Sequence, residues 1–127
     1  MSQLSLSGIE QSLLSIPNEL EVSDLALAQL RFALGDAEDT LEVAKTNAAL
    51  KAPEASNEQR RKLNRESAIA NDQACWERAQ QVRDTKNHIA ELEADNARLR
   101  RQFAAACHLA ELAASNNYLM AKGGKHE

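Results

Sequence analysis

Leucine recurs every seven residues between positions 20 and 41 of this 127-residue chain. Seven residues are close to two turns of an α-helix, so the repeat places all its members on one helix face. A companion series three residues further on completes the a/d spacing of a coiled coil. The main series is Leu20, Leu27, Leu34, Leu41 and Ala48, and the companion series is Leu30, Ala37 and Ala44. An apolar seam of this kind requires a partner helix.

A second seam in the same chain predicts that partner. Its first series is Cys75, Val82, Ile89, Asn96, Phe103 and Ala110, and its second is Thr85, Leu92, Leu99, Ala106 and Ala113. Two seams joined by a short polar connector favour an antiparallel coiled coil within the chain. The predicted fold class is therefore all-α, a long helical hairpin that oligomerises into a helical bundle.

The composition agrees with an all-α protein that has a thin core. Aromatic residues make up 3% of the chain, and it has four glycines and two prolines, which is little material for strands and turns. Alanine supplies much of the hydrophobic fraction of 43%. Narrow Ala/Leu stripes bury little apolar surface, and small proteins often complete such a core by oligomerisation.

Prolines and capping residues divide the first part of the chain. Pro17 closes a weakly patterned segment, residues 1–17, which is expected to be an N-terminal arm or a short helix. Asn18 then offers an N-cap for a helix over about 19–51. Pro53 disfavours helical backbone in the residue before it and so ends this helix.

A second helix is expected over about 57–115. Ser56 opens it with a capping box. Asn71 and Asp72 either interrupt this helix or occupy exposed positions on it, and the sequence leaves both alternatives open. Residues 116–127 are expected to form a flexible tail.

The sequence favours a cytoplasmic protein. The two cysteines, Cys75 and Cys107, do not make a disulfide framework and suit a reducing compartment. The N-terminus lacks the basic region of a signal peptide, and no apolar run approaches the length of a membrane span. We therefore expect no membrane partner.

Residues 60–68 and 91–99 resemble the basic leucine-zipper family, whose continuous helices carry basic side chains into the major groove. Asp72 occupies a position where the family has an arginine, and its charge would repel phosphate. The family's leucine positions fall here on Val82, Ile89, Asn96 and Phe103. These residues have a companion series three residues on and so behave as a positions. We therefore reject sequence-specific zipper binding.

Asn96 has two interpretations. A polar residue at an a position costs stability and fixes helix register or partner number. Alternatively, Asn96 points to a solvent-exposed part of the seam. Neither interpretation is preferred by the sequence.

The densest positive cluster is a candidate contact for a polyanion. It consists of Arg60, Arg61, Lys62 and Arg65. Such residues can bind backbone phosphates without reading sequence. A solvated helix start is the alternative, although basic residues suit a helix N-terminus poorly. The charge is uneven along the chain, because residues 1–50 hold eight acids and two bases whereas residues 51–127 hold eleven acids and thirteen bases.

Trp76 is the single tryptophan. Aromatic side chains stack on unpaired bases, but a tryptophan beside a seam more commonly fills a helix interface. The histidines show no metal-ligand spacing, and the chain has no phosphate-binding loop or nucleophile motif. We therefore expect no enzyme activity, metal, cofactor or small-molecule substrate.

The order of helices and connector along the chain also resembles that of a known group of proteins. A long helix, a polar connector containing Asn57 and Arg60 in "NEQR", a basic stretch and a second long helix follow one another over residues 20–115. This layout is similar to small helical proteins that bacteriophages encode near recombination and replication genes, including recombination mediators of the UvsY type. The resemblance implies a helical oligomer that binds single-stranded DNA and helps to load a recombination protein.

Two functional hypotheses follow. The first is a non-enzymatic, phage-type accessory protein in the cytoplasm of a bacterial host, which binds single-stranded DNA non-specifically and assists recombination or replication. The second is a protein-interaction module that binds no nucleic acid: an adaptor, a scaffold or an inhibitor of a host or defence protein. The acidic first helix and the thin core motivate the second hypothesis.

Overall fold

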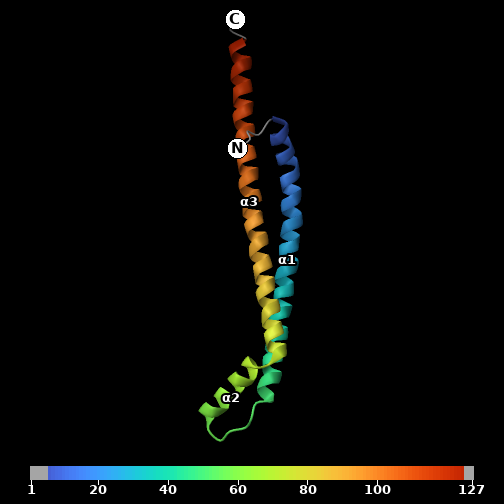
Figure 1. Cartoon of the computed structure of the whole chain (residues 1–127). Coiled ribbons are helices and arrows are strands. Elements are labelled where there is room, and N and C mark those ends of the chain that lie inside the picture. The colour runs from blue at the N-terminus through green and yellow to red at the C-terminus, as the bar shows by residue number, and fades with distance from the viewer. Residues whose placement is uncertain (1–5, 125–127) are drawn as a thin grey trace. The chain divides into compact units, whose positions relative to one another are not determined.

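The computed structural model describes the backbone of residues 6–124 and the side chains of residues 7–117. These residues form three helices and no strand: α1 (Leu6–Leu50), α2 (Glu58–Ala70) and α3 (Gln73–Gly124) (Figure 1). The all-α prediction is confirmed.

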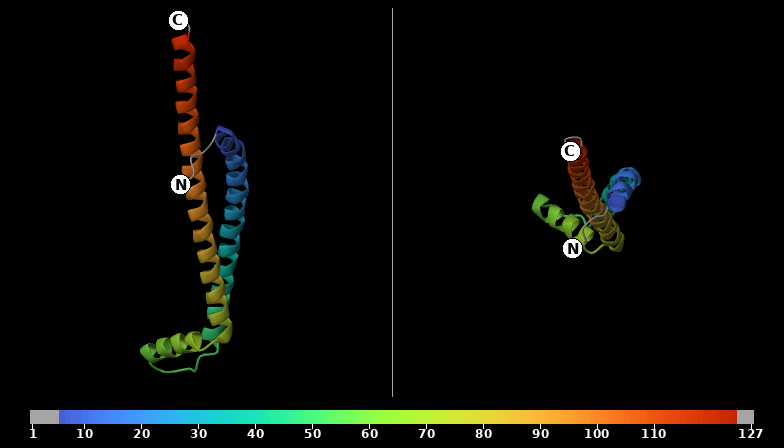
Figure 2. Two further views of the ribbon diagram at one scale, coloured as in Figure 1. Left: turned by 45° about the horizontal axis from the view of Figure 1, so that its top comes forward. Right: turned by 90° about the horizontal axis from the view of Figure 1, so that it is seen from above.

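The helices contribute to two compact units. Unit 1 combines the chain up to Ala26 with the chain from Leu92 onward, and unit 2 is Leu27–Glu91. Within unit 1, the first part of α1 lies antiparallel to the later part of α3 (Figure 2). Within unit 2, the end of α1 lies beside the start of α3, and α2 projects from this pair (Figure 1). The helical-hairpin prediction is confirmed by this pairing of α1 with α3.

Each unit has a narrow core made by the two seams. In unit 1 the buried residues are Ile9, Ile16, Asn96 and Ala106; in unit 2 they are Leu27, Ala37, Ala48, Cys75, Val82 and Ile89. The remaining seam positions singled out from the sequence are half-buried: Leu20, Leu30, Leu34, Leu41, Ala44, Thr85, Leu92, Leu99, Phe103, Ala110 and Ala113. The heptad positions therefore face the partner helix, and a single row of small and medium side chains forms the core.

The predicted boundary at Pro17 is wrong, because α1 continues through this residue. Asn18 consequently lies inside the helix and does not cap it. A proline inside a helix removes one backbone hydrogen bond. The flanking Ile16 is buried and Leu20 is half-buried, whereas Pro17 itself is exposed. Burial of the neighbouring apolar side chains offsets the local cost of the proline.

The helical region expected over 57–115 is divided at Asn71 and Asp72, so the interruption is the observed one of the two alternatives that the sequence left open. The backbone N–H of Asn71 donates to Ser67 O at 3.0 Å and ends α2. Asp72 then caps α3, since its Oδ2 accepts a 2.9 Å hydrogen bond from the Cys75 backbone N–H. A zipper needs a continuous helix from its basic region into its seam, so this break is a further reason to reject zipper binding.

The other helix ends also differ from the predictions. Asn57, and not Ser56, is the N-cap of α2, and its side chain accepts a 2.8 Å hydrogen bond from the Gln59 N–H. Helix α3 continues to Gly124, beyond the expected end near residue 115. The parts of the expected arm and tail in residues 1–5 and 125–127 lie outside the described residues.

Candidate nucleic-acid interface

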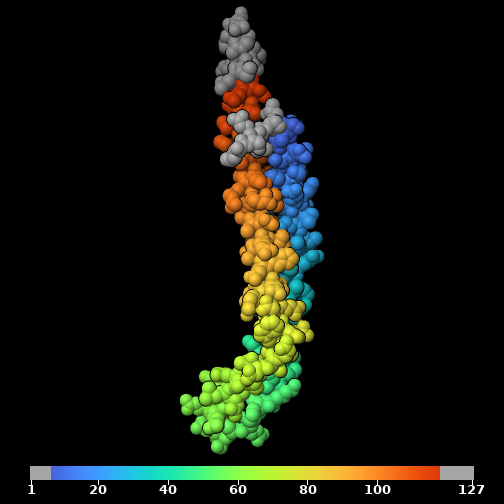
Figure 3. Space-filling model, viewed as in Figure 1, coloured from blue at the N-terminus to red at the C-terminus, as the bar shows by residue number. Residues whose placement is uncertain are grey.

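The four predicted phosphate-binding residues lie on α2 in unit 2. Arg60, Arg61, Lys62 and Arg65 are all exposed. Helix α2 has no buried residue, and its surface stands out from the rest of unit 2 (Figure 3). Asn64 ties it to the connector by donating from Nδ2 to Pro53 O at 3.1 Å. The basic side chains are therefore presented on a short, anchored helix.

The side chains of these four residues point in different directions around the axis of α2, because consecutive helical residues are about 100° apart. Arg61 and Arg65 are one turn apart and lie on the same face of α2. Ile69 follows one turn later on that face, so the row ends on an apolar side chain. Arg60 and Lys62 flank this row on neighbouring faces. The structure therefore brings Arg61 and Arg65 into one basic row and leaves the other two cations beside it.

The basic row leads to an open hollow in unit 2. This hollow has a volume of about 210 Å³. Its lining residues are Leu41, Lys45, Ile69, Ala70, Cys75, Trp76 and Ala79. Residues from α1, α2 and α3 thus meet at one place, where the basic helix adjoins an apolar surface.

Trp76 is 62% exposed, so its commoner role of filling a helix interface does not describe it. The preceding Cys75 occupies the buried seam position, with an exposed fraction of 4%. Because consecutive residues in a helix point about 100° apart, Trp76 is turned out of the seam. The sequence alone could not decide between these roles, since a residue next to a seam can be covered by a neighbouring element or left open.

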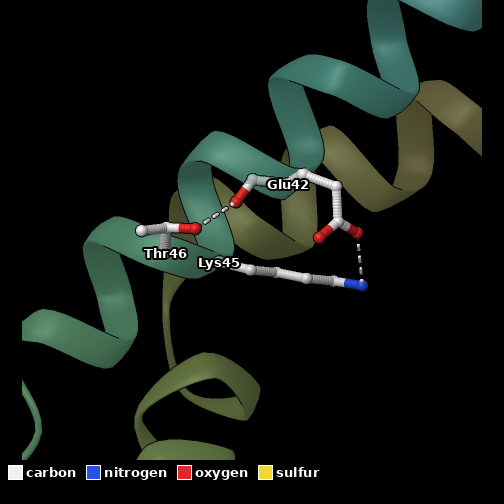
Figure 4. Close-up of polar contacts among 3 residues, drawn as sticks. All are labelled: Glu42, Lys45 and Thr46. Carbon is white, nitrogen blue, oxygen red and sulfur yellow. Dashed lines mark hydrogen bonds and ion pairs between the residues drawn. The ribbon is translucent and has the colours of Figure 1, made fainter.

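Lys45 adds a cation to the hollow that the sequence did not single out. Its Nζ lies 3.5 Å from Glu42 Oε1, and Thr46 Oγ1 donates to Glu42 O at 3.0 Å (Figure 4). The Lys45 side chain is 42% exposed. An exposed ion pair of this length is weak, so Lys45 can turn toward an anion at the hollow. In the sequence, only its spacing of one helical turn from Leu41 indicated that Lys45 lies beside the seam.

Asp72 and Cys75 are coupled at the start of α3. The pKa of Asp72 lies below its usual value, mainly because the Cys75 backbone N–H donates to its carboxylate, with further contributions from the Cys75 side chain and the Lys51 charge. Burial raises the pKa of the Cys75 thiol, and Asp72 adds to this shift. Asp72 therefore acts as an ionised helix cap, and Cys75 is a neutral core residue without the thiolate character that a nucleophile needs.

Asn96 lies in the seam of unit 1, away from the basic helix in sequence. It is 5% exposed, so the interpretation that it points to solvent is wrong. Its Nδ2 donates to Asp24 Oδ1 at 2.8 Å, and Arg100 Nη2 lies 3.6 Å from the same oxygen. The buried Asn96 Oδ1 and Ser23 Oγ have no hydrogen-bond partner among the described residues.

Within the described part of the chain, no group of three His, Cys, Asp or Glu side chains converges in a way that could hold a metal ion. Across the same residues, no helix combines the length and apolar character needed to cross a membrane. The basic row and the Trp76 hollow together form the candidate nucleic-acid site in unit 2.

Comparison of the chain with protein-family models, with curated proteins and with solved structures finds no significant match.

Proposed function

We propose that unit 2 binds single-stranded DNA without reading its sequence, as part of a phage-type accessory protein that assists recombination or replication in the bacterial cytoplasm. The observation that carries this proposal is the exposed basic row on α2. Helix α2 contains four bases and two acids, and guanidinium groups bind phosphate oxygens through paired hydrogen bonds. The order of helices and connector supports the proposed biological setting.

The arrangement favours contact with the phosphate backbone over reading of base edges. A reading helix inserts into the major groove and presents a fixed set of side chains to the bases. Helix α2 has only 13 residues, and Arg60 to Arg65 point in several directions around it. Such side chains can follow a flexible strand, and contacts to phosphate and sugar carry no direct sequence information.

The proposal is tested by measuring the fluorescence anisotropy of a labelled oligo(dT) at several salt concentrations. We expect binding that weakens as salt rises, because each phosphate contact releases counterions. The double variant Arg61→Ala/Arg65→Ala should reduce the slope of log affinity against log salt by roughly 1.4, at about 0.7 for each lost contact. Arg83→Ala, which removes an exposed arginine on α3 of unit 2, is the matched control. Salt-independent binding or no binding would reject the proposal.

A specific observation also favours a protein-interaction role as a second candidate. In unit 2, α1 exposes Phe32, Val43 and Leu50 at 74%, 59% and 79%. Their spacings of eleven and seven residues correspond to about three and two helical turns, so they share one face. Large apolar side chains gathered on one face are typical of an interaction surface. We propose that a second copy of the chain covers this face in a homo-oligomer.

The second candidate is tested by measuring the molar mass of the full chain in solution by light scattering. Phe32→Lys should lower the mass to that of one chain. Glu38→Lys, a charge change at an exposed position about 120° around the same helix from Phe32, should leave the mass unchanged. A nuclease-treated pull-down tests the wider interaction role of an adaptor or inhibitor, because the protein partners of such a module survive nuclease and partners bridged by DNA do not.

A further inference from the structure

We infer that the hollow beside Trp76 holds one unpaired nucleobase, stacked on the indole, so that the site prefers single strands to duplex. The inference rests on the proposed function, because it names the part of the nucleic acid that occupies this hollow. Its first support is that Trp76, the single tryptophan of the chain, is 62% exposed at the rim of an apolar depression.

The size and lining of the hollow suit a planar ring. An apolar cavity of about 150 Å³ holds benzene, and the hollow measures about 210 Å³. Leu41, Ile69 and Cys75 supply apolar walls, and the exposed indole supplies a flat π-surface. Bases stack on such aromatic platforms largely without regard to sequence, because every base has a π-face.

The charges around the hollow distinguish a nucleotide from an apolar peptide side chain. Lys45 lies at the hollow itself, where its Nζ is 3.5 Å from Glu42 Oε1 in an exposed, weak ion pair. The row of Arg61 and Arg65 ends on the wall residue Ile69. Exposed acids are also close in sequence, namely Glu66 on α2 and Glu77 on α3. Glu77 accepts a hydrogen bond from Gln73 Nε2 at 3.2 Å. A strand whose phosphates follow the arginine row would place the next base over the hollow.

The structure also explains why a duplex would be excluded from this contact. Bases in a duplex are already stacked and paired, and extracting one costs free energy. The phosphate contacts of α2 are available to duplex and single strand alike. The Trp76 hollow is therefore the part of the site that selects unpaired bases, and the arginine row supplies general affinity.

The intrinsic fluorescence of the single tryptophan tests this inference directly. The full chain is titrated with oligo(dT), with the corresponding duplex and with inorganic polyphosphate, which has the charge but no bases. We expect oligo(dT) to quench Trp76 fluorescence, and polyphosphate to displace labelled oligo(dT) without quenching. Trp76→Ala should weaken oligo(dT) binding about 5- to 150-fold, the range that stacking of one base gives, and change duplex binding less than twofold.

Variants and outcomes separate this inference from the proposed function. Trp76→Phe keeps an aromatic ring and should retain most of the single-strand preference, which excludes a folding defect as the cause of the alanine effect. If salt-sensitive oligo(dT) binding persists without quenching and without an effect of Trp76→Ala, the inference fails and the proposed function stands. If oligo(dT) does not bind at all, both fail. A concentration-dependent blue shift of Trp76 emission in the absence of DNA would show that a second copy covers the hollow, and would overturn the inference.

Discussion

Asn96 donates from its Nδ2 to Asp24 Oδ1 over 2.8 Å, joining α3 to α1 within unit 1. The bond gives an acceptor to the Nδ2 group of a polar side chain that is buried in an otherwise apolar seam, whereas Oδ1 of the same amide has no partner among the described residues. A slip of α1 by one heptad would place Arg31 or Pro17 opposite Asn96 in place of Asp24. Arginine has no acceptor, and proline has no polar side-chain atom. Asp24 is therefore the acceptor that fixes the pairing of the two helices in this register.

Removing Asp24 should destabilise the protein through Asn96. Asp24→Ala leaves the buried Asn96 amide without its acceptor, which costs about 1–3 kcal/mol of unfolding free energy. In the background of Asn96→Leu the same change should have little effect, since the amide is gone. Urea denaturation of the two single variants and the double variant gives the coupling energy. Additive effects in this cycle would show that the hydrogen bond contributes nothing to stability.

Pro17→Ala should stabilise unit 1. Pro17 is exposed within α1, where it lacks the backbone N–H that the helix would use. Alanine is favoured over proline in a helix interior by up to about 3 kcal/mol. The thermal midpoint should rise, and far-ultraviolet circular dichroism should show no loss of helix. Asn18→Ala, at the neighbouring exposed position, serves as the control. An unchanged or lower midpoint for Pro17→Ala would contradict the continuous helix seen here.

Gly35→Ala should stabilise unit 2 by about 1 kcal/mol, the difference in helix propensity between the two residues. Apart from its chain neighbours and the backbone of its own helix, a Cβ at Gly35 would meet no atom within 4 Å among the described residues. The substitution therefore gains propensity without steric cost. Chemical denaturation measures the gain. A decrease in stability would mean that another chain packs closely against Gly35, which would itself support the homo-oligomer.

The sequence predicted the features of this fold that depend on the heptad repeat. It did not decide the helix boundaries, where the same residue types suit more than one backbone conformation. The heptad series identified Leu27, Val82 and Ile89 as core residues, because burial follows directly from position on a helix face. Asn71 and Asp72 were ambiguous, since the same residue types occur at exposed helix positions and at caps. At Pro17 the helix continues because the burial of neighbouring apolar side chains outweighs the unfavourable helix propensity of proline.

The candidate site divides in the same way. Arginine and lysine side chains are charged and are therefore mostly exposed, so the sequence was enough to predict an exposed basic cluster. The hollow was not, because it forms only where Ile69 of α2, Trp76 of α3 and Lys45 of α1 come together. No spacing in the chain predicts that meeting, since it depends on the turn at Asn71 and Asp72 that separates α2 from α3.

Asp72 should make the stability of unit 2 depend on pH in acid. Its folded-state pKa lies below its ordinary value, mainly because the Cys75 backbone N–H donates to the carboxylate. The folded state therefore holds this proton less readily than the unfolded state does. The resulting stabilisation is fully present above the ordinary pKa of the carboxyl group and is lost as pH falls through the lowered value.

Asp72→Asn isolates this effect, because asparagine also caps a helix but does not titrate in this range. The difference in thermal midpoint between wild type and Asp72→Asn should be constant from neutral pH down to about pH 5, and should shrink as the pH falls below about 4. Asp72→Ala should lower the midpoint at neutral pH, since it removes the cap as well as the charge. Parallel pH profiles for wild type and Asp72→Asn throughout the acid range would show that the Asp72 carboxylate is not engaged with the Cys75 N–H.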